Sequence, residues 1–595
     1  MCGVSGEVRF DGRRPDLAAV ERMTDALEER GPDGRGVWSQ GAVALGHRRL
    51  KIIDLSERGA QPMTDPQLGL TAVFNGCVYN YRELRGRLEG LGHRFFSDSD
   101  TEVLLKAYGQ WGRECVDFLV GMFAFAVVEH HTGRVVLGRD RLGIKPLYVT
   151  QGCDRLRFAS SLPALLAGGG VDTSLDPVAL HQYLSWHGTV VAPRTVLAGV
   201  RKIPPATVRV IERDGTHRDH CYWQPSYTRD RHSELGDDPA LWREAVHDAL
   251  RTAVRRRTVA DVPLGVLLSG GLDSSLIVAL LAEEGQRDVA TFAMGFEAEN
   301  GEEGDEFRYS DLVARRFSTD HHQFMIPSDR LPAALETAIG AMSEPMISHD
   351  AVAFHMLSEQ VAKEVKVVLC GQGADEVFAG YHWYPPIASA ARDGAPAAYA
   401  DAYFDRTHAD LTAMLHPAAA ADHDSSRDFV RAHMDAPGAE TALDAALRLD
   451  VHALMADDPV KRVDNMTMAW GLEARVPFLD HEVVELAAAC PPELKLAQGG
   501  KAVLKDIGRK ALPREVVDRP KGYFPVPAVR HMAEPVLARV RDALTAPEAR
   551  RRGIFDQRYV AELLAAPNLH RTKRGANTLW QVASLELWLQ AHGVK

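Results

Sequence analysis

The sequence has no long apolar run, few cysteines and no excess of positive charge. Its longest apolar stretch, GMFAFAVV at residues 121–128, is far shorter than the roughly 20 residues that a membrane-spanning helix needs. The seven cysteines are widely spaced, with no CxxC or zinc-ligand spacing, and no apolar signal region follows Met1. The formal net charge of −12 argues against a broad nucleic-acid-binding surface. We therefore expect a cytoplasmic protein that binds neither membrane nor nucleic acid.

The chain is too long for one core, and its two halves differ in pattern. Of the 595 residues, 2–210 are rich in short extended runs separated by turns, which predicts a mixed α and β domain with much antiparallel sheet. Residues 211–240 are polar and weakly periodic and are expected to form a linker. Across 241–595, apolar runs first alternate with helical stretches, which predicts a doubly wound parallel sheet. Beyond 385 the chain becomes alanine-rich and mostly helical, and its role stays unassigned.

A glycine-rich loop joins a predicted strand to a predicted helix in the second half. The stretch LLSGGLDSS at 267–275 would aim backbone N–H groups and a helix N-terminus at one spot, which attracts phosphate. It matches neither the Walker A pattern nor G-x-G-x-x-G, so other nucleotide loops are disfavoured. The residues expected to contact phosphate are Ser269, Gly270, Gly271 and Ser274.

Two aspartates accompany this loop. Asp273 lies within it, and Asp375 lies in CGQGADE (370–376), which follows the predicted strand VKVVL. Because the carboxyl ends of parallel strands meet at one edge of a sheet, both carboxylates could bind one Mg²⁺. The alternative is that both aspartates are helix N-caps.

Together with two further motifs, these loops resemble the glutamine-hydrolysing asparagine synthetase family. The pieces that carry the resemblance occur in the family's order and are DVPLGVLLSGGLDSS, CGQGADEVFAGY, VDNMTMAWGLEARVPFLDHE and RPKGYF. The resemblance covers nearly the whole chain. It implies an N-terminal class II glutamine amidotransferase domain, an Ntn hydrolase with an αββα sandwich, followed by a synthetase domain of the PP-loop ATP pyrophosphatase type. It also implies ATP and Mg²⁺ as cofactors and suggests a homodimer.

Cys2 is the predicted nucleophile of the first domain. Removal of Met1 would leave Cys2 with a free α-amino group, whose pKa of about 7.7–8.0 suits it to take the proton of the neighbouring thiol. The resemblance assigns Asn75 and Gly76 to the oxyanion site. It assigns Arg49 to the α-carboxylate of glutamine and Asp100 to its α-ammonium group.

The resemblance also implies the chemistry of the second domain. ATP would activate an acceptor carboxylate as an acyl-adenylate, and ammonia from glutamine would reach it through an internal tunnel. Asp273 and Asp375 would hold Mg²⁺ with pyrophosphate, and Lys521 in RPKGYF would stabilise negative charge. The positions that match the lining of the AMP site are Leu267, Met294 and Gly371.

Two departures from the family pattern concern the acceptor. Cys77 follows Asn75-Gly76 where many members have Glu, and Gln372 replaces the Glu of a usual Ser-Gly-Glu-Gly, which removes a possible base. Together with FASSLPALLA and MSEPMISHDAVAF, these departures resemble a subgroup, the N-acetylglutaminylglutamine amidotransferases, which make an osmoprotectant. We therefore expect the blocked dipeptide as acceptor, with L-aspartate as the alternative.

Three other classes are less compatible with the sequence. A peptide- or lactam-forming synthetase with an inactive glutaminase domain usually lacks the N-terminal cysteine, which is present here. A tRNA-modifying PP-loop protein would need a basic surface. A non-catalytic binding protein would have no need for Asp273, Asp375 and Lys521 together.

Overall fold

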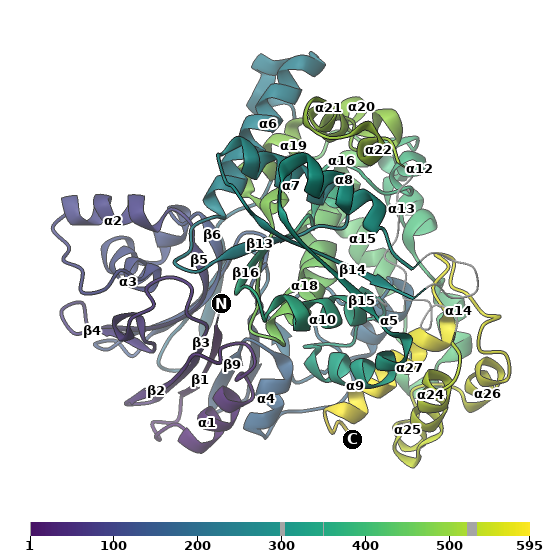
Figure 1. Ribbon diagram of the computed structural model, residues 1–595. Helices are drawn as coiled ribbons and strands as arrows, with labels where there is room; N and C mark the ends of the chain where they lie inside the picture. Colours follow the sequence, from purple (N-terminus) through teal and green to yellow (C-terminus); the bar gives the residue numbers. More distant parts are fainter. Residues whose placement is uncertain (1, 298–303, 349, 520–531) are drawn as a thin grey trace.

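Two antiparallel six-stranded sheets form the first part of the molecule. The computed structural model describes residues 2–297, 304–348, 350–519 and 532–595 (Figure 1). The first sheet has the strand order β10 (Arg201–Lys202), β8 (Tyr148–Gln151), β9 (Arg155–Ala159), β1 (Gly3–Arg9), β3 (Val43–Arg49) and β2 (Gly34–Gln40). The second has the order β12 (His217–Cys221), β11 (Thr207–Ile211), β7 (Val135–Arg139), β6 (Gly121–Glu129), β5 (Leu70–Val78) and β4 (Met63–Asp65).

The two sheets pack face to face between helices. Alternating apolar side chains, such as Val4 and Leu45 of the first sheet and Val73 and Leu137 of the second, form one buried cluster. Helices α1 (Leu17–Asp25) and α4 (Leu162–Gly168) pack against the first sheet, and α2 (Tyr81–Gly90) and α3 (Asp100–Trp111) lie on the side of the second. The αββα sandwich is therefore confirmed.

Strand β12 lies within the stretch for which a linker was expected. Its residues pair antiparallel with β11, and all five of them are exposed. Because an exposed edge strand needs no apolar alternation, its sequence HRDHC carries no strand signal.

A five-stranded parallel sheet organises the second part. Its order is β15 (Asp320–Ile326), β14 (Ala290–Phe296), β13 (Leu264–Leu267), β16 (Val367–Leu369) and β17 (Glu473–Arg475). From the central β13 the chain winds first to β14 and β15 and then returns to β16 on the other side. The topological switch point, where doubly wound folds bind ligands, therefore lies between the carboxyl ends of β13 and β16.

Helices cover this sheet on two sides (Figure 1). One group comprises α6 (Pro239–Arg256), α7 (Leu272–Glu283), α8 (Phe307–Phe317) and α21 (Ala502–Ala511). The other comprises α9 (Leu331–Ala341), α10 (Asp350–Val361), α18 (Pro459–Met468) and the long α27 (Thr578–Ala591). The predicted doubly wound sheet is confirmed.

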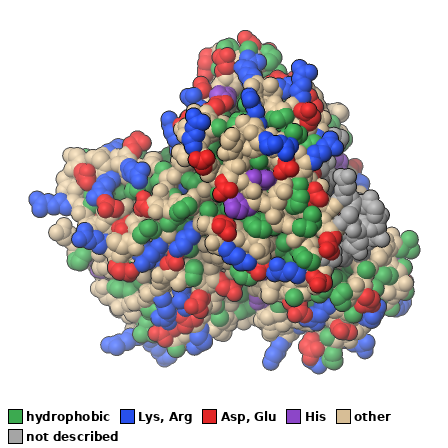
Figure 2. All heavy atoms as spheres, viewed as in Figure 1, with side chains coloured by type: hydrophobic (Ala, Val, Ile, Leu, Met, Phe, Trp, Pro, Cys, Tyr) green, Lys and Arg blue, Asp and Glu red, His purple; other side chains and the backbone are tan. Residues whose placement is uncertain are grey.

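The helices beyond residue 383 build most of a separate hydrophobic cluster, which also includes Trp186 and Tyr227. It is built mainly by α12 (Tyr384–Ala388), α13 (Ala395–Tyr403), α15 (Ser425–Asp435) and α16 (Ala442–Leu449). Within the described residues, no helix is long and apolar enough to cross a membrane. On the face shown in Figure 2, acidic and basic side chains are interspersed, which agrees with the absence of a basic excess in the sequence.

Candidate functional site

Four of the predicted glutamine-site residues line one small cavity in the first part of the chain. They are Cys2, Arg49, Gly76 and Asp100. Cys2 directly precedes β1, Arg49 ends β3, Gly76 lies in β5 and Asp100 begins α3. The cavity therefore lies where both sheets and a helix N-terminus meet, and residues nearly 100 positions apart converge on the Cys2 thiol.

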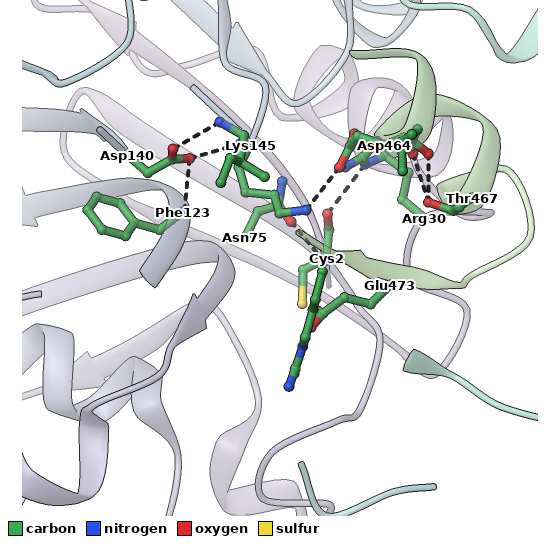
Figure 3. Close-up of polar contacts among 12 residues, drawn as sticks. Cys2, Arg30, Asn75, Phe123, Asp140, Lys145, Asp464, Thr467 and Glu473 are labelled. Atoms are coloured by element: carbon green, nitrogen blue, oxygen red, sulfur yellow. Dashed lines mark hydrogen bonds and ion pairs between the residues drawn. The ribbon is translucent and has the colours of Figure 1, made fainter. Parts of the chain in front are cut away.

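Asn75, the fifth predicted residue, lies against the same nucleophile. Its Oδ1 accepts a hydrogen bond of 3.0 Å from the backbone N–H of Cys2 (Figure 3). That contact fixes the orientation of the amide, and its Nδ2 is buried with no hydrogen-bond partner in the described part of the chain. A buried donor beside a nucleophile is suited to receive a negatively charged oxygen. At the next residue, a Cβ on Gly76 would lie 2.1 Å from the Met122 carbonyl oxygen, so only glycine fits.

The environment of the Cys2 thiol keeps it neutral in the ligand-free pocket. Cys2 is buried, and burial raises the pKa of its thiol, which the Leu50 backbone N–H and the charge of Arg49 partly oppose. The Arg49 guanidinium is itself held by the backbone, because it donates to the carbonyls of Asp54 and Ser56. A thiol in this state needs an adjacent base to become a nucleophile.

Asp100 is a buried carboxylate that forms no salt bridge with the described residues. The backbone N–H of Val78 donates to its Oδ2 at 3.1 Å. Burial nevertheless dominates and raises the pKa of Asp100 to about 6. A bound ammonium group would relieve this penalty, so the geometry suits a cationic ligand group.

Two residues of the second half also line this cavity, and sequence reasoning gave them no role. Glu473 and Arg475 lie on β17, and Arg475 Nε donates to Glu473 Oε1 at 2.6 Å. Burial favours the neutral acid, but nearby positive charges, first that of the N-terminal α-amino group and then those of Arg475 and Lys145, outweigh it and hold the pKa of Glu473 at about 2. Arg475 Nη2 also lies 3.8 Å from Cys77 Sγ, across 398 positions of sequence.

A second set of contacts ties the nucleophile to the second half of the chain (Figure 3). Arg30 Nε donates to the Cys2 carbonyl at 3.4 Å, and Arg30 Nη1 donates to Asp464 Oδ2 of α18 at 2.9 Å. Lys145 Nζ donates to the other oxygen of Asp464 at 3.2 Å. All three charged groups are buried. The position of Cys2 therefore depends on a carboxylate more than 400 residues away.

The glycine-rich loop lies at the switch point of the parallel sheet. Leu267 is the last residue of β13, and α7 begins after Gly271. Gly270 has φ of +71°, and a Cβ there would lie 2.6 Å from Ser310 N, so this position requires glycine. Ser269 Oγ and Ser274 Oγ are 3.2 Å apart across the loop. The loop thus presents hydroxyls and a helix N-terminus together, as predicted for phosphate.

Asp273 and Asp375 converge on one cation, the ammonium group of Lys501. Its Nζ lies 2.6 Å from Asp273 Oδ2 and 2.9 Å from Asp375 Oδ1. Burial opposes the charge of Lys501, but the two carboxylates outweigh it and raise its pKa. The N-caps of the two helices are Gly271 and Gly373, so the alternative role of the aspartates as helix caps is wrong. Two carboxylate oxygens that share one cation are a donor set that fits Mg²⁺.

The second acidic loop touches the first. A Cβ on Gly371 would lie 2.9 Å from Asp273 Cβ, so the two loops are in contact. Met294 lies in β14, on the neighbouring strand at the same edge of the sheet. Lys521 lies outside the described residues.

A short route joins the two sites. The backbone N–H of Cys370, at the start of the loop 370–376, donates to the carbonyl of Arg475 at 2.9 Å. The side chain of Arg475 lines the cavity of Cys2, whereas Gly371 contacts Asp273. Strands β16 and β17 therefore connect the cavity to the glycine-rich loop within a few residues.

Comparisons with known proteins cover nearly the whole chain. The sequence model "Asparagine synthase" matches residues 245–590, and "Glutamine amidotransferase domain" matches residues 1–223. Asparagine synthetase [glutamine-hydrolyzing] 3 of Bacillus subtilis is 28% identical, with 100% of this chain and 99% of that protein covered. Asparagine synthetase [glutamine-hydrolyzing] 1 of the same organism is 30% identical, with 96% and 93% covered. A putative asparagine synthetase of Mycobacterium tuberculosis is 31% identical, with 86% and 84% covered.

Proposed function

The chain belongs to the asparagine synthase family of glutamine-hydrolysing carbon–nitrogen ligases, and on that premise we propose that it amidates a carboxylate through an acyl-adenylate. Nitrogen comes from glutamine at Cys2, and ATP is cleaved at the glycine-rich loop to AMP and pyrophosphate. The observation that carries the proposal is the paired geometry: a cysteine nucleophile with a buried amide donor, joined through β17 and β16 to a phosphate loop with two convergent carboxylates.

Cys2 attacks the side-chain amide of glutamine in the first step. Once Met1 is removed, the nitrogen that now contacts Asn75 Oδ1 becomes the free α-amino group and takes the thiol proton. Asn75 Nδ2 donates to the oxygen of the tetrahedral intermediate, together with the backbone at Gly76. Collapse of the intermediate releases ammonia and leaves a thioester, which water hydrolyses.

Arg49 and Asp100 hold the other end of glutamine. The guanidinium of Arg49 binds the α-carboxylate, and the carboxylate of Asp100 binds the α-ammonium group. Because Cys77 supplies no charge, we assign the α-ammonium group to Asp100 alone. Glu473 is ionised in the same cavity but already paired with Arg475, so we assign it to the wall of the pocket and not to glutamine.

The synthetase site would hold ATP, which the family uses, and Mg²⁺. The glycine-rich loop, with Ser269, Gly270, Gly271 and Ser274, would receive the phosphates, and Asp273 and Asp375 would hold the Mg²⁺ ion. Bound Mg²⁺ would neutralise charge on the leaving pyrophosphate. Lys501, which pairs with both carboxylates in the ligand-free site, would then be available to the phosphates, and Lys521 is the second lysine that we assign to negative charge on the basis of the sequence. Leu267, Met294 and Gly371 line the AMP subsite.

We propose L-aspartate as the acceptor, because the relatives that span the chain are asparagine synthetases by name. The blocked dipeptide expected from the sequence has no support among these relatives. It remains the second candidate on one observation: Gln372, beside Gly371, can donate and accept hydrogen bonds but cannot act as a base.

Product analysis tests the proposal. Purified enzyme receives ATP, Mg²⁺ and glutamine with either aspartate or N-acetylglutaminylglutamine, and AMP and amide are quantified. We expect AMP and asparagine with aspartate. If the dipeptide is amidated and no asparagine forms, the dipeptide is the acceptor and the proposed reaction stands. If no AMP forms with either acceptor, the proposed function is refuted.

A further inference from the structure

A group of aromatic and charged side chains adjoins the second acidic loop and has no role in the steps above. Tyr381 OH donates to Glu376 Oε1 at 2.7 Å, and Glu376 directly follows Asp375 of the proposed metal site. The Tyr381 ring stacks on Trp383 with centroids 4.0 Å apart, and Trp383 meets Tyr403 at 5.0 Å. The aromatic side chains thus form a wall that begins one residue from the synthetase centre.

Arg574 contacts these rings, and Arg462 lies within electrostatic reach of Tyr381 and Glu376. The Arg574 guanidinium lies 4.4 Å from the ring centroid of Trp383 and 4.0 Å from that of Tyr403. Arg462 of α18 is 9% exposed, and its Nη1 donates to Asp458 Oδ1 at 3.3 Å. The charge of Asp458 also acts on Arg574, so both guanidinium groups lie within electrostatic reach of one carboxylate.

Each arginine has one buried N–H donor that makes no hydrogen bond to the described residues. Within the described part of the chain, Arg462 Nε and Arg574 Nη1 are buried and have no hydrogen-bond partner. An unsatisfied buried N–H of a charged group is costly, so these two N–H groups are suited to hydrogen-bond an oxygen atom of a ligand. Asp458, Tyr381 and Arg574 are only half-buried, so the region is not sealed inside a core.

We propose that Arg462 and Arg574 bind the non-reacting oxygen atoms of the acceptor, while its reacting carboxylate lies at the loop 370–376. The inference rests on the proposed function and adds the residues that select the acceptor. Guanidinium groups present planar donors that suit carboxylates and carbonyls, and the rings of Trp383 and Tyr403 pack against the carbon skeleton.

Two acceptors could supply this oxygen chemistry. Aspartate carries a second carboxylate, whereas a blocked dipeptide carries neutral carbonyl groups once its single carboxylate reacts. Hydrogen bonds between charged groups are stronger than those to neutral carbonyls, so the loss of an arginine costs more for aspartate. The size of the effect therefore distinguishes the two sources.

Steady-state kinetics of Arg574→Gln and Arg462→Gln test the inference. Pyrophosphate release is followed with ammonium chloride in place of glutamine, so that the Cys2 site takes no part. We expect the KM for aspartate to rise about 10- to 100-fold, or the KM for the dipeptide about 3- to 10-fold, with the KM for ATP unchanged. The matched control is Arg558→Gln, whose side chain is 90% exposed, and it should behave as wild type.

The outcomes separate the inference from the proposed function. If wild type releases no pyrophosphate with either acceptor, both fall. If wild type is active and both variants keep the acceptor KM within twofold, the inference is overturned and the proposed function stands. If the Gln variants do not fold, Arg574→Lys replaces them: it keeps the charge but not the planar fork, and an unchanged acceptor KM again overturns the inference.

Discussion

The protonation of Asp100 makes glutamine binding dependent on pH in a direction that the structure determines. Burial raises the pKa of this carboxyl from its ordinary value of 3.8 to about 6 in the empty cavity. Above pH 6 the group is ionised and can pair with the α-ammonium group of glutamine. Below pH 6 it is neutral and loses that pairing. The bound ammonium stabilises the ionised form, so the pKa of Asp100 falls when glutamine binds.

The size of the pH effect on glutamine binding follows from the shift in the pKa of Asp100. A rise in the pKa of Asp100 from 3.8 to about 6 corresponds to about 3 kcal/mol between its two protonation states. If bound glutamine returns Asp100 to its ordinary pKa, the KM for glutamine rises about tenfold per pH unit below pH 6 and saturates near 100-fold. Asp100→Asn should raise this KM by about 100-fold at pH 7.5 and remove the additional rise below pH 6.

Ammonia release from glutamine between pH 4.5 and 8 provides the assay. The α-amino group and thiol of Cys2 also titrate, so the informative quantity is the ratio of KM between wild type and Asp100→Asn at each pH. Asp98→Asn is the matched control, because that side chain is 89% exposed and lies outside the cavity. A ratio that does not change with pH would refute this reading of Asp100.

Three further predictions concern the nucleophile, the contact between the two halves of the chain and the loop 370–376. Cys2→Ala should abolish glutamine use but keep synthesis with added ammonia, and loss of both activities would contradict two separate sites. Asp464→Asn should lower the free energy of urea unfolding by about 3–5 kcal/mol, because it leaves two buried cations without their counter-charge, and an unchanged transition would contradict this. Gly371→Ala should slow pyrophosphate release but not glutamine hydrolysis, because overpacking against Asp273 costs about 1–3 kcal/mol, whereas Gly86→Ala, with open space around it, should have no effect.

Local motifs made much of both sites predictable. The glycine-rich loop carries its backbone geometry in adjacent residues, so Ser269, Gly270 and Asp273 could be named from sequence. The same holds for Asn75 and Gly76, which follow one another on β5. A motif of this kind identifies chemistry because the residues that act together are also neighbours in the chain.

Partners that are distant in sequence could not be predicted in this way. Glu473 lies on a strand of three residues, too short for any periodic signal, and reaches the Cys2 cavity only through the packing of the two halves. Lys501 is one of many lysines until the fold places it between Asp273 and Asp375, more than 100 positions away from either. Arg462 and Arg574 likewise come within reach of one carboxylate, that of Asp458, only because the fold brings α18 close to the chain before α27.

Transfer of labelled nitrogen tests the coupled reaction most directly. The enzyme is given glutamine labelled with ¹⁵N in its side-chain amide, together with ATP, Mg²⁺ and aspartate, and the product amide and nucleotides are analysed together. The account predicts that the amide carries the label and that one AMP forms for each labelled amide. Labelled ammonia that never enters a product, or formation of ADP in place of AMP, would contradict it.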